Sequence, residues 1–292
     1  MKFCLYLPPF GPYGDAQTLA NLAQDAERAG WDGFFIWDHI AGERYPERMV
    51  DPWVALAAIA LNTKKIRIGA LVTPIPRRRP WKVARESVSI DHLSGGRLIF
   101  GVGTGSGVGE WDNLGEEPDQ KTRGEMLDEG LEVVTALWSG KRTNISGKHY
   151  KIKDTLFLPK PIQEPRIPIW VAGIWPNKKP FRRAARWDGM FPLFPHVGDK
   201  TLDQLKDLVN YIKRWRDPDK PFDILFRGFP LPNDDPEEAV QILKPYEEIG
   251  VTWWQLSISP MSYGKELKGD WPLDEMRATI LTGPPRLSGN SA

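Results

Sequence analysis

The sequence predicts an α/β protein, a (β/α)8 barrel of the TIM type with a short insertion after the fourth βα unit. Short apolar segments alternate with amphipathic segments along the whole chain, a pattern typical of parallel βαβ connections. About eight such units follow one another, which is the number that closes a barrel. No linker-like stretch interrupts the 292 residues, so we expect one domain spanning residues 1–292.

The expected strands are apolar runs bounded by Gly, Pro or polar residues. They cover residues 2–7, 33–37, 66–72, 98–102, 167–172, 189–193, 223–226 and 252–258. An open doubly wound sheet is the alternative arrangement of such strands. It would carry a phosphate-binding glycine fingerprint after the first strand, where this sequence reads PPFGPYG instead, so the closed barrel is favoured.

The expected helices follow the strands in turn. The first begins at Asp15, places Leu19, Leu22 and Ala26 on one face, and stops at Gly30, a residue typical of helix C-termini. The others cover residues 52–61, 81–93, 121–138, 178–186, 202–215, 236–249 and 274–281. Each would cover the outside of the barrel between two strands.

Two stretches fall outside this alternation. Residues 141–166 contain a glycine and several prolines, and they predict the insertion in the form of a hairpin. Residues 284–292 predict a frayed C-terminal tail.

Composition excludes several classes of protein. A net charge of +1 gives the molecule no strong attraction to nucleic acid or to a membrane surface. The single cysteine, Cys4, rules out an intramolecular disulfide framework. No stretch reaches the roughly 20 apolar residues of a transmembrane helix, and prolines break the first apolar run too early for a signal peptide. We expect a soluble, cytoplasmic protein without nucleic-acid or membrane partners.

A glycine-rich stretch, RLIFGVGTGSGVGEW at residues 97–111, carries glycine at every second position from Gly101 to Gly109. It lacks both the glycine spacing of a dinucleotide fingerprint and the lysine of a P-loop. It therefore predicts a barrel strand followed by a glycine-rich loop, whose backbone a ligand can approach closely. A turn without a ligand is the alternative.

The active site of such a barrel lies at the C-terminal ends of the strands. The residues expected there are mainly apolar, aromatic or small, and they include the acidic-histidine pair Asp38-His39. The four histidines show no metal-ligand spacing, and no G-x-S-x-G elbow is present. A flat conjugated ring needs walls of this kind, so we expect such a ring and no metal site.

Four blocks of the sequence carry a resemblance to a known family. They read GWDGFFIWDHI (30–40), TKKIRIGALVTPIPRRRPWKVARESVSIDHLSGGRLIFGVGTG (63–105), RGEMLDEGLEVVTALWSG (123–140) and PIQEPRIPIWVAG (161–173). Together they resemble the bacterial luciferase-like flavin-dependent oxidoreductases, over nearly the whole chain and in the order of that family. The fold that this resemblance implies is a barrel with an insertion, which agrees with the count of strands and helices.

The resemblance implies a reduced flavin-type cofactor at the barrel mouth, either FMN or the deazaflavin coenzyme F-420. It implies a catalytic His39 beside the reacting face of the ring, with Asp38 contacting the ring or orienting His39; a helix N-cap is the alternative for Asp38. It places a non-proline cis peptide at Ala70-Leu71 and a hydrogen bond from Thr73 to the ring edge, although Thr73 could be a plain turn residue. The other residues implied to line the ring are Gly103, Thr104, Gly105, Ala172 and Gly173.

The sequence departs from the family pattern at two places. Deazaflavin-dependent dehydrogenases of the family often carry Glu directly after the GVGTG block, where this chain has Ser106, and the nearest acid is Glu110. Many monooxygenases carry a second histidine where this chain has Ile40. The departures point in opposite directions, so both cofactors stay open.

Several charged and aromatic residues complete the candidate site. Lys178, at a helix start, and Arg227, after the seventh strand, are candidates for binding the cofactor's phosphate, with a solvated surface charge as the alternative. The run of arginines at 77–79 is interpreted as the solvated start of a helix, within reach of a phosphate. The substrate pocket is expected to include Trp37, Ser106, Trp111, Trp175 and His196.

The function that follows is that of an oxidoreductase acting on a small organic substrate. With FMN, a separate flavin reductase would supply the reduced cofactor for oxygenation; with the deazaflavin, hydride would pass between cofactor and substrate. The alternatives are a flavin-binding barrel without catalysis, and a phosphate-binding barrel lyase or isomerase without a redox cofactor. The resemblance also implies a homodimer.

Overall fold

The barrel is built from one parallel sheet. The computed structural model describes residues 1–41, 45, 48–106, 109–195, 201–231 and 235–285. Within them the strand order is β3-β2-β1-β11-β10-β9-β8-β5-β4. The strands are β1 (Lys2–Leu7), β2 (Gly33–Ile36), β3 (Arg67–Ala70), β4 (Thr73–Pro74), β5 (Phe100–Gly103), β8 (Ile169–Ile174), β9 (Gly189–Leu193), β10 (Asp223–Arg227) and β11 (Trp253–Ser257).

β3 and β4 are consecutive pieces of one strand and share one barrel position. β3 pairs with β2, and a bridge joins Ile68 to Leu98 just before β5. β4 pairs with β5 through Thr73 and Val102. The two ends of the sheet therefore meet, and the predicted (β/α)8 barrel is confirmed.

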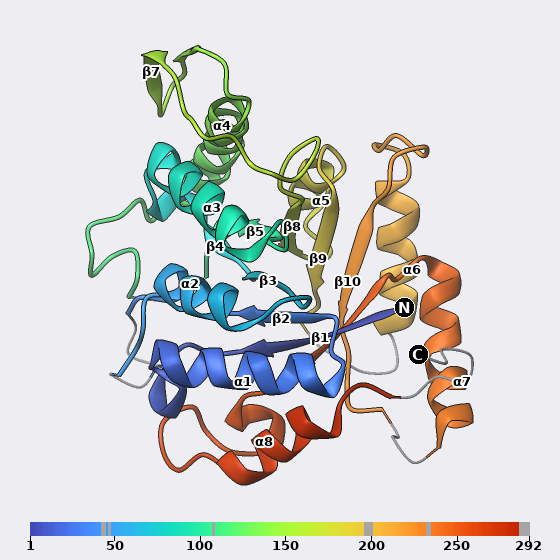
Figure 1. Cartoon of the computed structure of the whole chain (residues 1–292). Helices are drawn as coiled ribbons and strands as arrows, with labels where there is room; N and C mark the ends of the chain where they lie inside the picture. The colour runs from blue at the N-terminus through green and yellow to red at the C-terminus, as the bar shows by residue number, and fades with distance from the viewer. Residues whose placement is uncertain (42–44, 46–47, 107–108, 196–200, 232–234, 286–292) are drawn as a thin grey trace.

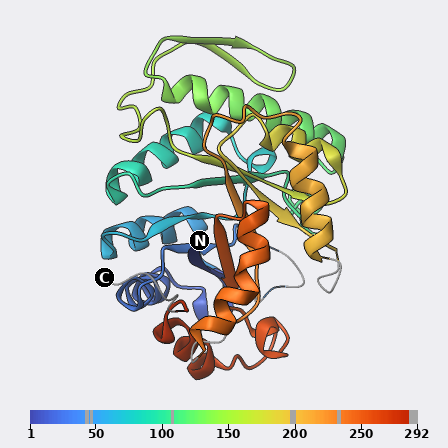
Figure 2. The same cartoon turned by 90° about the vertical axis from the view of Figure 1, so that its right-hand side faces the viewer.

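The helices cover the outside of this sheet, as the two views at right angles show (Figure 1, Figure 2). Helix α1 shows how local sequence sets their ends: the Asp15 carboxylate accepts a hydrogen bond from Thr18 N at 2.8 Å, and Gly30 adopts the left-handed conformation that closes the helix. The helices are α1 (Ala16–Ala29), α2 (Pro52–Asn62), α3 (Pro80–Ser94), α4 (Gln120–Trp138), α5 (Lys178–Ala184), α6 (Thr201–Ile212), α7 (Pro236–Ile249) and α8 (Leu273–Thr282).

An antiparallel hairpin stands outside the barrel, beyond α4 (Figure 1). It consists of β6 (Thr143–Ser146) and β7 (Lys151–Thr155) and lies within residues 141–166. The Glu129 carboxylate on α4 accepts hydrogen bonds from His149 N and Tyr150 N, which fixes the turn of the hairpin to that helix.

The buried apolar residues form two groups, one on each side of the sheet. The larger group lies between the strands and the surrounding helices. The smaller group fills the interior of the barrel, because alternate residues of each strand point inward. Its members are Cys4, Phe35, Leu71, Ile99, Trp170, Phe191, Leu225 and Trp253.

Glycines in β5 allow it to lie close against β3. A Cβ atom on Gly101 would lie 2.3 Å from the carbonyl oxygen of Ala70 and 2.5 Å from Leu71 Cδ2. A Cβ atom on Gly103 would lie 2.7 Å from Val72 Cγ2. The alternating glycines at these two positions therefore serve strand packing directly.

The non-proline cis peptide bond lies between Leu71 and Val72, so the predicted position at Ala70-Leu71 is wrong by one bond. Strand pairing explains the difference, because Leu71 N still donates to the Ile36 carbonyl oxygen at 2.9 Å. The regular backbone therefore continues through Leu71, and the change of direction comes after it. The expected strand over 66–72 is divided there into β3 and β4.

Candidate active site

A cavity of about 250 Å³ opens at the C-terminal ends of the strands. Its walls come from the ends of β1, β3, β8, β9 and β10 and from the loops that follow β2 and β5. The lining is mostly aromatic and aliphatic, with a group of charged side chains on one wall. The lining residues are Tyr6, Trp37, Asp38, His39, Tyr45, Leu71, Val72, Pro74, Gly105, Ser106, Glu110, Ala172, Phe191, Leu193, Arg227 and Met261.

Asp38 is held by two arginines. Its Oδ1 accepts a hydrogen bond from Arg77 Nη2 at 2.6 Å, and its Oδ2 accepts one from Arg78 Nη2 at 2.9 Å. The side chains of Asp38 and Arg77 are almost completely buried. Arg77 and Arg78 therefore point toward Asp38 and not into solvent, and the interpretation of this arginine run as a solvated helix start is wrong for these two residues. Arg79, the third of the run, is exposed.

The acidic partner of His39 is Glu110 rather than the adjacent Asp38. His39 Nδ1 lies 3.2 Å from Glu110 Oε2, and His39 Nε2 lies 3.2 Å from the hydroxyl of Tyr45. The expectation that Asp38 orients His39 is therefore wrong, because both carboxylate oxygens of Asp38 face the arginines. Glu110 thus contacts His39 from a position 71 residues further along the chain.

Glu110 is held as a carboxylate by its hydrogen-bond partners. Burial alone would raise its pKa, but the hydrogen bond from His39, the Arg77 cation and the backbone N–H of Ile40 outweigh burial and lower it. The Ile40 N–H donates to Oε1 at 2.7 Å, and Arg77 Nη1 donates to Oε2 at 2.7 Å. An ionised Glu110 can only accept, so the hydrogen bond to His39 requires the proton on Nδ1.

Because Nδ1 carries the proton, Nε2 of His39 is an acceptor. In the neutral imidazole the second nitrogen carries a lone pair, and the Tyr45 hydroxyl can donate to it. Both His39 and Tyr45 line the cavity. A substrate hydroxyl that reached Nε2, directly or through Tyr45, would therefore meet a proton acceptor.

The floor of the cavity lies beside the cis peptide. The Tyr6 hydroxyl donates to the carbonyl oxygen of Leu71, the residue before that bond. Burial raises the pKa of Tyr6, and the neighbouring Arg227 cation offsets part of this rise. Tyr6 therefore stays a neutral donor, and it fixes the backbone on which a planar ring could rest.

The residues proposed for the cofactor ring divide into those that line the cavity and those behind it. Leu71, Gly105 and Ala172 line it. Thr73 is fully buried, and its hydroxyl has no hydrogen-bond partner among the described residues. The remaining four lie behind the wall or beside it: Ala70, Gly103, Thr104 and Gly173.

The two phosphate candidates lie in different surroundings. Arg227 lines the cavity. Lys178 Nζ lies 5.6 Å from the centre of the Tyr211 ring, on the α5–α6 side of the molecule. Lys178 is also exposed and is not among the lining residues, so Arg227 is the better placed of the two.

The predicted pocket residues also divide. Trp37 and Ser106 line the cavity. Trp111 packs behind Gly105, where an added Cβ atom would lie 2.4 Å from the indole. The guanidinium group of Arg123 lies 4.0 Å from the centre of the Trp111 ring. Trp175 contacts Phe181 and Tyr211 outside the cavity, and His196 lies outside the described residues.

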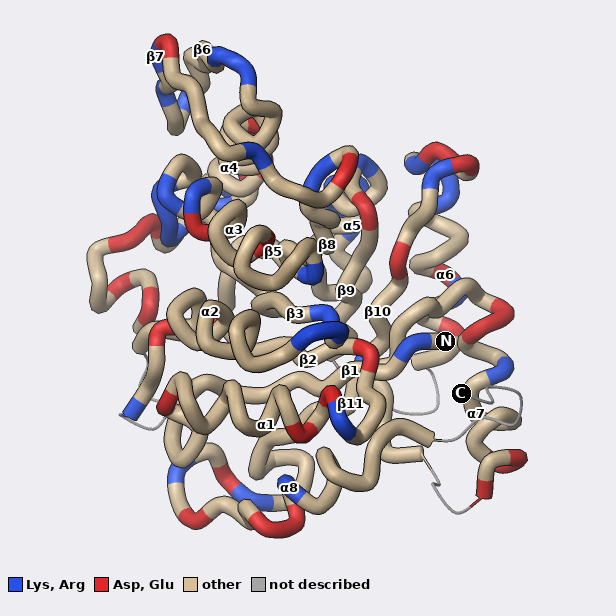
Figure 3. The backbone as a smooth tube through the Cα atoms, in the orientation of Figure 1, with Lys and Arg blue, Asp and Glu red and all other residues tan. Residues whose placement is uncertain are grey.

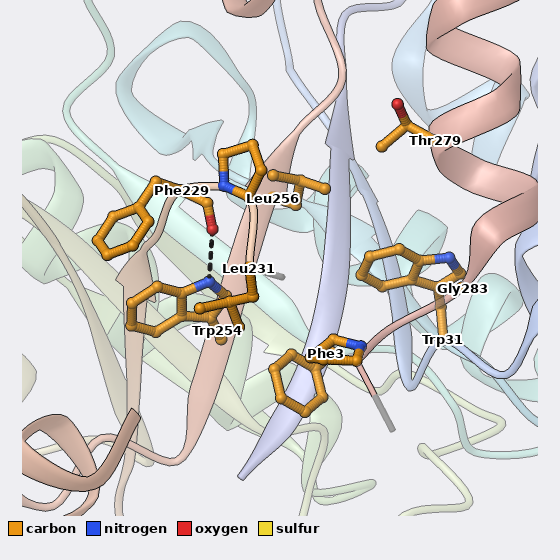
Figure 4. Close-up of a pocket in the computed structure, with 10 residues that line it drawn as sticks. Phe3, Trp31, Phe229, Leu231, Trp254, Leu256, Thr279 and Gly283 are labelled. Atoms are coloured by element: carbon orange, nitrogen blue, oxygen red, sulfur yellow. Dashed lines mark hydrogen bonds between the residues drawn. The ribbon is translucent and has the colours of Figure 1, made fainter. Parts of the chain in front are cut away.

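A second hollow lies outside the barrel, between β1, β11 and the end of α8, and is shown in Figure 4. It holds only about 60 Å³ and is lined largely by apolar side chains such as Phe3, Trp31 and Trp254. The two indole N–H groups already donate to carbonyl oxygens, that of Trp254 to Phe229 at 3.1 Å and that of Trp31 to Ile280 at 2.9 Å. This hollow offers little to recognise a polar ligand.

A comparison with models of protein families assigns the chain to a family. The family model described as luciferase-like monooxygenase matches residues 1–279. The chain belongs to the luciferase-like monooxygenase family.

Individual relatives include enzymes named for different cofactors. The chain is 29% identical to the oxygenase component of a flavin-dependent trigonelline monooxygenase from Acinetobacter baylyi, over 77% of this chain and 61% of that protein. It is 32% identical to an F420-dependent glucose-6-phosphate dehydrogenase from Amycolatopsis mediterranei, over 56% of this chain and 48% of that protein. The chain thus matches about half to three fifths of the length of these relatives.

A solved structure supports the fold of this luciferase-like chain. The monooxygenase RslO1 from Streptomyces bottropensis superposes with a TM-score of 0.74 at 19% sequence identity, covering 96% of each chain. At this level of identity the likeness shows the fold alone. It agrees with the closed barrel described above.

The luciferase-like cavity fits a flavin-type ring. Leu71 and Val72 offer an apolar floor, Gly105 and Ala172 leave room on the walls, and Arg227 offers a cation for an anionic group. Among the described residues, no three metal-ligating side chains lie together, and no helix is long and apolar enough to cross a membrane. Lys and Arg are interspersed with Asp and Glu along the described chain (Figure 3).

Sequence reasoning missed several residues of this luciferase-like site, among them Tyr6, Tyr45, Arg77 and Glu110. Arg77 and Glu110 both follow strands, where the residues of a barrel active site gather, but nothing in the sequence pairs them with Asp38 and His39. The inward turn of Arg77 was not readable from a run of three arginines. Tyr6 follows the inward alternation of β1, which could have placed it at the mouth.

Proposed function

We propose that this chain is a deazaflavin-dependent oxidoreductase that interconverts a small alcohol and its carbonyl compound in the cavity at the strand ends. The observation that carries the proposal is the pairing of His39 with Glu110 in the cavity wall. Glu110 supplies the acid that the residue after the GVGTG block, Ser106, lacks. When bound, the deazaflavin accepts or donates a hydride.

The side chains of this wall would manage the proton. When the alcohol gives up a hydride from its carbinol carbon, the proton of the alcohol's hydroxyl group would move to His39 Nε2. The C–O bond would then become a carbonyl group. Glu110 keeps the Nδ1 proton in place and stabilises the imidazolium that forms, because it is an ionised carboxylate 3.2 Å away. The reverse reaction returns the proton from Nε2 to the new alcohol.

The rest of the cavity would bind and shield the reactants. Trp37, Phe191 and Leu193 would exclude water from the reacting atoms, and the Arg227 cation would hold an anionic group at the mouth. The apolar and aromatic lining favours a small organic substrate with a single polar end.

An FMN-dependent monooxygenase is the second candidate. It is favoured by the trigonelline monooxygenase component, which matches more of this chain than the named dehydrogenase does. In that case a separate reductase would supply reduced FMN and the substrate would be oxygenated. In either case the homodimer stays a prediction, which light scattering on the purified protein can test.

Binding and turnover separate the two candidates. Purified protein is titrated with FMN and with the deazaflavin, each oxidised and reduced, and followed by visible absorbance and calorimetry. We expect tight binding of the deazaflavin, and a bleaching of its visible band when alcohols are added. Preference for FMN selects the monooxygenase, and binding of neither would overturn both.

The variant His39→Ala tests the proton-transfer role. We expect its turnover to fall by about 100-fold or more, since a positioned acid–base group contributes 10²–10⁴-fold. Its thermal midpoint should change little, because His39 lies at the partly exposed cavity wall. Turnover equal to that of the wild type would remove His39 from the mechanism.

A further inference from the structure

Arg77 joins the two carboxylates of the cavity wall through opposite ends of one guanidinium group. Its Nη1 donates to Glu110 Oε2 at 2.7 Å, and its Nη2 donates to Asp38 Oδ1 at 2.6 Å. Nη2 also lies 3.3 Å from the carbonyl oxygen of Asp38. Only the planar fork of arginine can hold two carboxylates in fixed directions at once, because a lysine presents a single point charge.

The cluster is closed to solvent and balanced in charge. The side chains of Arg77, Asp38 and Glu110 are each at most 2% exposed, and Arg78 is 14% exposed. Two guanidinium cations face two carboxylates, so the sum is zero when His39 is neutral. Protonation of His39 would add one uncompensated positive charge to this buried group, which is costly in a medium of low polarity.

We propose that Arg77 is a positioning residue that holds Glu110 against His39 Nδ1 and keeps the imidazole neutral, so that Nε2 remains a proton acceptor beside the Tyr45 hydroxyl. Arg77 is not among the residues that line the cavity, so we place it out of reach of a cofactor or substrate bound there. It acts through Glu110, whose Oε2 is shared between the guanidinium group and the imidazole. The inference rests on the proposed role of His39 in proton transfer.

Other groups around His39 set its charge as well. Asp38 and Arg78 lie behind it in the same wall, and Tyr45 meets Nε2. Tyr6 and Arg227 line the same cavity, and the raised pKa of Tyr6 keeps that hydroxyl neutral at physiological pH. Of these groups, Arg77 is the cation that contacts the Glu110 carboxylate. Loss of Arg77 alone leaves a surplus negative charge beside His39.

Nitrogen NMR on the protein without cofactor tests the proposal directly. The sequence has four histidines, so the His39 signals can be assigned by their loss in His39→Gln. The variant Arg77→Met should raise the ratio of imidazolium to neutral imidazole at His39 about tenfold at neutral pH, because an unbalanced carboxylate within hydrogen-bond reach favours the charged form. The matched control, Arg79→Met, changes the exposed arginine two residues away and should leave the ratio unchanged.

A charge-balanced double variant guards against loss of folding. Arg77→Met combined with Glu110→Gln removes one charge of each sign, so the ratio at His39 should return to the wild-type value or below. The proposal is overturned if His39 has the wild-type ratio in folded Arg77→Met, or if the double variant keeps the raised ratio. The NMR measurements use protein without cofactor, so the His39 ratios in both variants can be interpreted even if the proposed redox function is wrong.

Discussion

At the level of single residues, the buried charges of the cavity wall depend on one another. Glu110 accepts hydrogen bonds from a guanidinium group, an imidazole and a backbone N–H, and its side chain is 1% exposed. Such a carboxylate cannot lose its charge without depriving Arg77 of one of its two buried carboxylate partners. The site is therefore sensitive to isosteric changes that alter charge alone.

The variant Glu110→Gln should show this sensitivity as a pH-dependent loss of stability. The pKa of Glu110 is lower in the folded protein than in the unfolded chain, so its carboxylate stabilises the fold at pH values above the unfolded pKa. That stabilisation disappears as pH falls through the lower, folded value. We expect the variant to lose about 3–5 kcal/mol of unfolding free energy at neutral pH, and less in the acid range.

Urea unfolding at about pH 7, 5 and 3.5 measures this difference across the range in which glutamates titrate. The matched control is Glu132→Gln on the exposed side of α4, which should change stability by less than about 0.5 kcal/mol. A loss in Glu110→Gln that stayed constant down to the lowest pH would contradict an ionised, hydrogen-bonded Glu110.

At the level of elements, the contact between β3 and β5 closes the barrel beside the active site. Gly101 lies where the Ala70 carbonyl oxygen leaves no room for a side chain. The obstacle is a backbone atom, which cannot rotate aside as a side chain can.

The variant Gly101→Ala should therefore lower the unfolding free energy by about 1–3 kcal/mol, the usual cost of overpacking a core. Gly124 on α4 supplies a control of the same chemistry, because its Cβ atom would meet only the end of Arg183 at 3.5 Å. Gly124→Ala should stabilise the protein by about 0.5–1 kcal/mol. In chemical denaturation, the changes in unfolding free energy of the two variants should have opposite signs. Equal stability of Gly101→Ala and wild type would contradict the packing constraint at Gly101.

The elements of this fold were largely predictable, and their deviations have local causes. The alternation of apolar strands and amphipathic helices fixes which segments form strands and helices, since each periodicity buries one face. The division of the third strand at Leu71 was not visible, because a cis peptide leaves no mark on the hydropathy pattern.

The site was predictable only in part, for a similar reason. His39, Trp37 and Ser106 follow strands directly, so the barrel geometry places them at the mouth. Glu110 and Arg77 reach the same wall from loops, and no periodicity governs the path of a loop. Their pairing depends on contacts between residues 33 positions apart.

At the level of the whole molecule, the barrel is closed by strands from opposite ends of the described chain. β1 pairs with β11 through Tyr6 and Ser257 and with β2 through Tyr6 and Phe35. Removal of β11 would leave the facing edges of β1 and β10 unpaired and would take the buried Trp253 and Trp254 out of the core. The barrel is therefore one cooperative unit rather than a stack of independent pieces.

Two deletions test this unity. A chain that ends at Gly250 should lack a cooperative thermal transition, because it loses a full barrel strand and α8. Replacement of residues 143–155 by a short Gly-Ser linker should lower the midpoint yet keep a single sharp transition, since the hairpin lies outside the barrel sheet. Calorimetry distinguishes the results; a sharp transition in the chain ending at Gly250 would contradict closure as the source of cooperativity.

The position of β1 between β2 and β11 also matters while the protein is being made. The ribosome synthesises about 5–20 residues each second, so the roughly 250 residues between the two partners take on the order of 10–50 seconds to emerge. During that time the nascent chain carries an open strand edge, which other chains can pair with. The need for chaperones during synthesis should therefore be greatest just before β11 leaves the ribosome.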